Sequence, residues 1–112
     1  MNCHSFFNSF ESLDPVEVER GLRVSSLLIH GHEARRIDVD PETRIPPHRH
    51  PSDVLTMVLE GRLQMTVGCE TKIIGPGELF LVPALTDHEG KALQDKVRAV
   101  SFSRVIGEGE SP

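Results

Sequence analysis

Short apolar segments, each ended after a few residues by glycine, proline or aspartate, constrain most strongly how this chain can fold. From residue 21 onward these interruptions recur about every 8–12 residues, the spacing of a sandwich or barrel. No segment has the apolar periodicity of a helix of about ten or more residues. Many short antiparallel strands have edges that need protection, and closure of the sheet supplies it. The pattern therefore predicts an all-β fold.

The interruptions also place the individual strands. Pro76-Gly77 predicts a type II turn, and Gly68-Cys69 predicts a two-residue hairpin loop. Two runs, 54–59 and 79–82, are continuously apolar, so we expect both of their faces to be covered. Strands are predicted at residues 22–29, 34–39, 54–59, 63–67, 71–74, 79–82 and 97–105, with one more extended segment opening at His88.

A chain of 112 residues is long enough for one domain with one core. We expect an N-terminal arm over residues 1–20, in which Asp14 caps a helical turn that starts at Pro15. The barrel is expected over residues 21–106, and a polar, flexible tail over residues 107–112. The formal net charge of −5 disfavours nucleic acid as a partner, and no apolar run of about 18 residues predicts a membrane span.

Cysteine usage and the N-terminal segment bear on location. Cys3 and Cys69 form no C-x-x-C motif, and the first residues lack the basic and long apolar parts of a secretory signal. We therefore expect free thiols and a cytoplasmic protein. Three phenylalanines of the arm (Phe6, Phe7 and Phe10) must be covered, either by their own barrel or by a partner subunit.

Two histidines alternate within the segment Pro46-Pro47-His48-Arg49-His50-Pro51. The prolines disfavour a helix here, and in an extended backbone residues i and i+2 project from the same face. His48 and His50 should therefore point together, with Arg49 on the opposite side. Two adjacent imidazoles supply half of a transition-metal site, although the same pair also occurs on ordinary surface strands.

A third histidine, His88, completes a pattern that resembles the two motifs of the cupin superfamily. The sequence reads P-x-H-x-H-P, then V-L-E-G, and later P-G-E, V-P and His88, over roughly residues 21–106. This resemblance implies a double-stranded β-helix (jelly-roll) barrel, commonly a homodimer. It also implies a metal held inside the barrel by His48, His50 and His88. The alternative is a relic site of packed histidines without metal.

The chain departs from the cupin motifs at three positions. Val54 stands where the family usually has a ligating Glu or Gln. Its neighbour Asp53 would face the other way on a regular strand, so only a bulge would make it a fourth ligand. Glu42 and Leu85 stand where the two motifs have glycine, so the second loop, residues 84–87, must form without glycine's freedom to take positive φ.

Three neutral imidazoles without a carboxylate accept a divalent ion, and nitrogen ligands suit zinc, nickel, iron(II) or copper better than magnesium or calcium. We expect one divalent transition metal; the sequence does not distinguish zinc, nickel, iron and manganese. Three protein ligands leave a position open, as in catalytic sites. Some thiol and diketone dioxygenases of the cupin superfamily also use three histidines without an acid, so the resemblance keeps an iron oxygenase as a hypothesis.

The chain also resembles small cupins of the pectin-degradation type, which linearise unsaturated uronates, at residues 91–95 and 100–103. Val100 stands in the place of that group's Asp, and Ile106 in the place of its Arg. Because the acid/base pair of that chemistry is missing, we do not expect the activity here.

Two functional hypotheses remain: a metal-dependent dioxygenase or isomerase acting on a small organic molecule, and a non-catalytic ligand-binding or sensing module. An enzyme usually positions a second polar group for proton transfer near its metal. We expect His30 and His32 to lie in a loop or at an exposed strand end. The candidates for proton transfer are Asp53, Gln64, Asp87 and Arg98, of which Gln64 and Arg98 can face either inward or outward.

Overall fold

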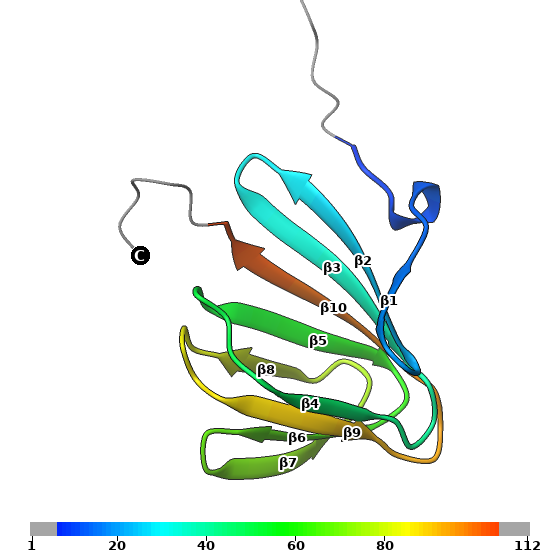
Figure 1. The fold of residues 1–112 in the computed structure, drawn as a ribbon, viewed down its shortest axis with the longest axis vertical. Coiled ribbons are helices and arrows are strands. Elements are labelled where there is room, and N and C mark those ends of the chain that lie inside the picture. Colours follow the sequence, from blue (N-terminus) through cyan, green and yellow to red (C-terminus); the bar gives the residue numbers. More distant parts are fainter. Residues whose placement is uncertain (1–6, 106–112) are drawn as a thin grey trace, which may run out of the picture.

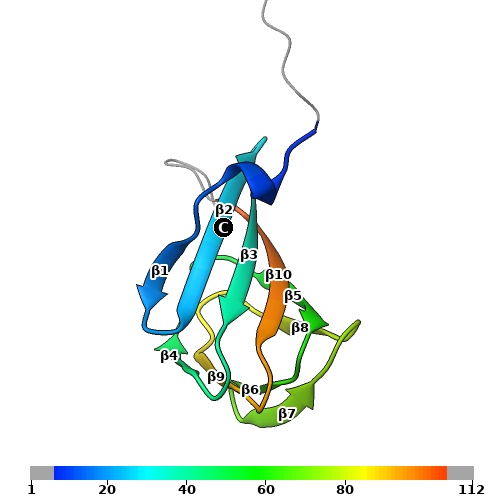
Figure 2. The same cartoon turned by 90° about the vertical axis from the view of Figure 1, so that its right-hand side faces the viewer.

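The computed structural model describes residues 7–105, which form two antiparallel sheets that face one another (Figures 1 and 2). The larger sheet has the strand order β1-β2-β3-β10-β5-β8, and the smaller has the order β4-β9-β6-β7. This arrangement confirms the all-β prediction and the jelly-roll barrel. The strands are β1 Val16–Glu19, β2 Leu22–Ile29, β3 His32–Val39, β4 Arg44–His48, β5 Val54–Glu60, β6 Leu63–Val67, β7 Glu70–Ile74, β8 Leu79–Val82, β9 His88–Ala92 and β10 Val97–Arg104.

The turns form where the glycine and proline signals predicted them. Val67 pairs with Glu70, so Gly68-Cys69 is a two-residue hairpin loop. At Pro76-Gly77 the Glu78 N–H donates to the Gly75 carbonyl oxygen at 3.0 Å, and Gly77 has φ 83°. Positive φ at the third residue is the mark of a type II turn.

The expectation that β5 and β8 are covered on both faces was wrong. In β5, Val54 is 5% exposed and faces the barrel interior, whereas Leu55 is 43% exposed. In β8, Leu79 and Leu81 are also exposed, at 53% and 52%. Successive strand side chains point to opposite faces, and no further layer of the described residues lies on the outer face of this sheet. A continuous apolar run therefore marks an apolar outer face here, not a second covering layer.

The predicted helical turn at Asp14-Pro15 was also wrong. One turn of 3₁₀-helix lies at Phe10–Ser12, where the Ser9 hydroxyl accepts from the Glu11 N–H. Residues 14 and 15 form no helical turn, and the chain continues from them into β1, which pairs with β2. The segment expected as an arm thus adds an edge strand, and Phe10 lies 5.8 Å from the Arg36 guanidinium carbon.

Other expectations for the termini fall outside the described residues. These are Cys3 and Phe6 near the N-terminus, Ile106, and the tail at residues 107–112. Within residues 7–105 no helix is long and apolar enough to cross a membrane.

The apolar core lies between the two sheets. Its most deeply buried members include Val58, Ala92 and Val97, all 0% exposed. Several core residues, such as Val39 and Met65, also line an internal cavity. The core therefore forms the floor of that cavity, and strands of both sheets form its walls.

Candidate metal centre

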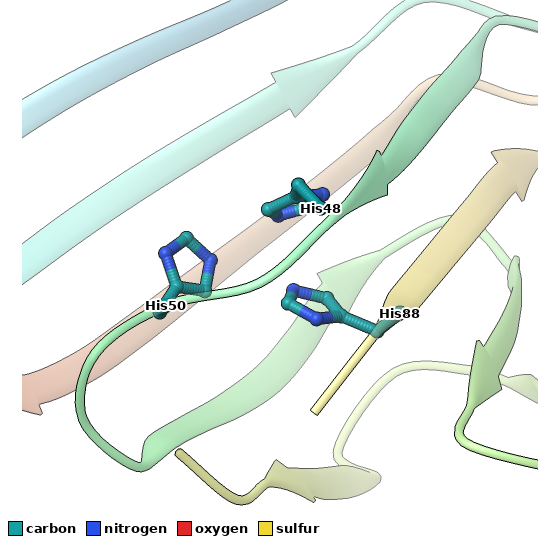
Figure 3. Close-up of side chains that lie close together, drawn as sticks. All are labelled: His48, His50 and His88. Carbon is teal, nitrogen blue, oxygen red and sulfur yellow. The ribbon is translucent and has the colours of Figure 1, made fainter. Parts of the chain in front are cut away.

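The three histidines predicted from the motifs lie together in the barrel. His48 ends β4, His50 follows in the next loop, and His88 begins β9 directly opposite His48 in the strand pairing. Their ring centroids are separated by 4.0 Å (His48–His88), 4.8 Å (His48–His50) and 5.1 Å (His50–His88). One ring nitrogen of each lies within 4.8 Å of the others, and Figure 3 shows the three rings gathered in one place. Segments 40 residues apart thus supply one cluster of nitrogen donors.

Two of the rings are held in the tautomer that leaves Nε2 free to bind a metal. Nδ1 of His48 lies 2.8 Å from the Pro46 carbonyl oxygen, and Nδ1 of His88 lies 3.0 Å from the Thr86 carbonyl oxygen. A carbonyl oxygen only accepts, so each Nδ1 carries the proton and donates it. Each Nε2 is left with a lone pair. Metal-ligating histidines are usually oriented in this way.

Burial keeps two of the rings neutral. Burial, followed by the positive charge of Arg35, lowers the pKa of His50 to about 4. Burial is also the main cause that lowers the pKa of His88. Since only neutral imidazole has a lone pair to donate, both rings are in the ligating form at neutral pH.

The loop that carries His50 is tied to the loop that precedes His88. The Leu85 N–H donates to the His50 carbonyl oxygen at 2.8 Å, and Asp53 Oδ1 accepts from the Ala84 N–H at 2.8 Å. The Arg49 guanidinium pairs with Asp87 at 2.8 Å, outside the cluster. These contacts set the spacing of the histidines.

The structure also shows what occupies the position of the family's ligating acid and where Asp53, the candidate fourth ligand, lies. Val54 is buried and lines the cavity, so the position of the usual ligating acid presents only methyl groups. Asp53 is exposed and bonded to the Ala84 backbone, and it does not belong to the histidine group. Among the described residues, the group of side chains that could hold a metal therefore consists of the three imidazoles and contains no carboxylate.

The glycine positions of the two motifs are occupied by residues with glycine-like backbone geometry. Glu42 and Leu85 both have φ 60°, in the left-handed region that residues with a Cβ rarely adopt. As expected, the loop at Leu85 forms without glycine, and it does so with a positive φ at a residue that carries a Cβ. The fold imposes the conformation that glycine would take more readily.

A cavity of about 560 Å³ adjoins the histidines. Its walls are mainly apolar and include Ile37, Phe80 and Val82. Arg35 also lines it, a residue that the sequence reasoning missed. The signal was the alternation of residues 35, 37 and 39 on β3: because Ile37 and Val39 face inward, Arg35 faces inward as well.

The four residues proposed for proton transfer do not line this cavity. Asp53 and Asp87 are engaged in the loop contacts described above. Gln64 is exposed between two buried neighbours of β6, and Arg98 donates to Asp38 at 2.8 Å. Both therefore face outward, and none of the four is positioned to transfer a proton at the histidines.

Three further residues named from the sequence lie away from the cavity. His30 lies in the two-residue loop between β2 and β3, and His32 is exposed at the start of β3. Val100 pairs with the outward-facing Met57, so it does not occupy an inward position on β10. Its inward neighbours Ala99 and Ser101 carry no carboxyl group either.

The barrel and the histidine cluster together define the class of protein: a single jelly-roll domain with three inward-facing imidazoles beside a cavity. A family model described as Cupin domain matches residues 35–103, more than half of the chain. The chain belongs to the cupin family. No curated protein sequence matches it.

Solved structures show the same fold. The chain is similar to KdgF from Halomonas sp. (26% identity, 91% of this chain and 94% of that chain, TM-score 0.76). It is also similar to an RmlC-like cupin from Shewanella frigidimarina (23% identity, 91% and 93% covered, TM-score 0.79). A match to an oxalate decarboxylase of Bacillus subtilis covers 88% of this chain but 29% of that one (16% identity, TM-score 0.79).

Proposed function

We propose that this cupin binds one divalent transition metal through His48, His50 and His88 and holds a small organic molecule in the adjoining cavity. The observation that carries the proposal is the fixed orientation of His48 and His88, whose Nδ1 atoms donate to backbone carbonyls so that Nε2 is available for metal. Neutral imidazoles suit zinc, nickel, iron(II) or copper in this role.

The open side of the centre favours chemistry on a ligand. Three protein ligands leave coordination positions for water or substrate, and the cavity extends from the histidines between apolar walls. A bound metal would supply Lewis acidity or an oxygen-binding site. The finer proposal is a dioxygenase or isomerase that acts on a small organic molecule.

The second candidate is a non-catalytic binding module, and one observation favours it. Among the described residues that line the cavity, the carboxylates are Glu19 and Glu33, and neither belongs to the histidine group. An isomerase needs a general acid or base at the reacting atom, whereas a binding module does not.

Metal analysis tests the proposal. Protein purified without a histidine tag or added nickel should contain about one transition-metal ion per chain, and His48→Asn, His50→Asn and His88→Asn should each lose it. His32→Asn removes an exposed histidine outside the group and is the matched control. Metal retained by all three variants would refute the site. Oxygen uptake after iron(II) loading then separates a dioxygenase from a binding module.

We also propose a homodimer formed through the outer face of the larger sheet. Leu55 lies between Phe102 and Leu81 in the strand pairing, and all three are exposed, at 43%, 51% and 52%. Contiguous apolar surface of this kind marks an interface. Light scattering should give a dimer, which Leu55→Ser with Leu81→Ser should dissociate. Removal of residues 1–14 should leave the dimer intact, because Phe10 packs on Arg36 of its own chain.

A cytoplasmic location remains a proposal, supported by Cys69, which is an exposed free thiol.

A further inference from the structure

A row of polar side chains crosses the inner face of the larger sheet. Ser26, Arg35, Ser101 and Thr56 lie directly opposite one another on the neighbouring strands β2, β3, β10 and β5, and all four line the cavity. The row two residues along each strand is apolar and consists of Val24, Ile37, Ala99 and Val58. The polar row therefore lies just above the core, inside the cavity.

Two members of this row have unmet hydrogen-bonding capacity. Ser101 is 1% exposed, and its Oγ has no hydrogen-bond partner. Arg35 Nε is buried and also has none; the nearest carboxylate oxygen is Oε1 of Glu33 at 3.8 Å, beyond hydrogen-bonding distance. A buried donor without a partner costs stability, so such groups in native proteins call for an explanation. A ligand that accepts from both supplies one.

The charge around the centre favours an anion. A divalent ion held by three neutral imidazoles keeps its full charge, because Val54 stands where the family acid would offset it. Arg35 adds a further positive charge, because it lines the same cavity as the three histidines. Glu33 lies at the same wall but is 35% exposed and only loosely paired with Arg35.

We propose that Arg35 and Ser101, with Thr56 beside them, bind the carboxylate of a small organic acid whose second oxygen group reaches the histidine centre. The planar guanidinium donates to the two oxygens of a carboxylate in matching geometry, and the serine hydroxyl adds a third donor. A cavity of about 560 Å³ accommodates such a molecule. This inference deepens the proposed function and rests on it for the metal-bound end of the ligand.

Ligand titration of the cobalt(II)-loaded protein tests the assignment. The probes are lactate, pyruvate, malonate and succinate, with lactamide as the uncharged counterpart of lactate. At least one carboxylate should bind, and Arg35→Gln should raise its Kd about tenfold to a hundredfold, the effect of losing a charged hydrogen-bond pair. Lactamide should bind equally weakly to both proteins. Arg44→Gln is the matched control, because Arg44 is 72% exposed and lies outside the cavity.

The outcomes separate this inference from the proposed function. Unchanged cobalt stoichiometry with equal carboxylate affinity in wild type and Arg35→Gln would overturn the subsite and leave the metal site standing. If Arg35→Gln does not fold, Ser101→Ala replaces it and should raise Kd about twofold to tenfold; no change would overturn the subsite.

If the protein binds no metal, amide shifts of the metal-free protein decide the question. Carboxylate-induced shifts at residues 35 and 101, absent with lactamide, would support the subsite although the proposed function had failed. No shifts would overturn both.

Discussion

Glycine at the two motif positions that lack it should stabilise the backbone of this protein. Glu42 and Leu85 both have φ 60°, and each donates its N–H to a neighbouring segment: Glu42 to the Leu93 carbonyl oxygen at 2.9 Å, Leu85 to that of His50 at 2.8 Å. Those bonds hold the left-handed conformation in place. The perturbation is Glu42→Gly and Leu85→Gly, each compared with the alanine variant at the same position.

The magnitude follows from two opposing terms. The left-handed conformation destabilises the folded state by about 1–2 kcal/mol for a residue with a Cβ, but not for glycine. Glycine loses about 0.5–1 kcal/mol more than alanine in chain entropy on folding. The glycine variant should therefore be more stable than its alanine counterpart by about 0.5–1 kcal/mol at both positions. Alanine keeps the strain and removes the same side chain, so side-chain contacts and charge cancel in the comparison.

The two positions differ in their comparison with wild type. Glu42 is exposed, so Glu42→Gly should be more stable than wild type by the full amount. Leu85 is 64% exposed, and losing its buried third costs about 0.5–1 kcal/mol, so Leu85→Gly should be close to wild type.

Urea denaturation of the metal-free proteins in EDTA measures these differences, with equal m-values as the condition for comparing midpoints. Alanine variants as stable as glycine variants at both positions would show that the turns carry no positive-φ strain, which would refute the reasoning.

Three further predictions address the fold and the centre. Gly61→Ala should destabilise the protein by more than about 3 kcal/mol in urea denaturation, because its Cβ would lie 2.2 Å from the Lys96 carbonyl oxygen at φ +75°; a loss under about 1 kcal/mol would contradict this. Val54→Glu buries a carboxyl group and should therefore lower the thermal stability of the metal-free protein. The same substitution should tighten zinc binding at least about tenfold, measured in competition with a chelator. Weaker zinc binding would show that residue 54 does not face the metal. The pKa of His50 falls from 6.5 to about 4 on folding, so as the pH is lowered the unfolded chain takes up the proton first and the unfolding free energy of the metal-free protein should decrease between about pH 6.5 and 4. His50→Asn should reduce this pH dependence of stability in thermal melts. An unchanged pH dependence would assign it to other groups.

The strand positions could be predicted from the sequence because turn chemistry is local. Proline at residue 76 and glycine at residue 77 specify one turn type regardless of the rest of the fold. The convergence of His48, His50 and His88 was predictable only from the motif pattern, since residues 48 and 88 meet through strand pairing that no local signal encodes.

What the sequence reasoning missed has a common physical cause. The period of a strand shows which residues share a face but not what covers that face. The apolar outer residues of β5, such as Leu55, were therefore assigned to a covered layer. The same period placed Arg35 with Ile37, but a charged residue on an inward face contradicts the expectation that charges are exposed. An inward-facing charged residue such as Arg35 is therefore a strong indication of a ligand-binding site.

X-ray absorption spectroscopy of the zinc-loaded protein tests the central claim most directly, because it counts the imidazoles bound to the ion. The account predicts three imidazole nitrogens at about 2.0–2.1 Å and the remaining positions filled by light atoms from solvent. Two or fewer imidazoles, or a sulfur neighbour at about 2.3 Å from a cysteine, would contradict it.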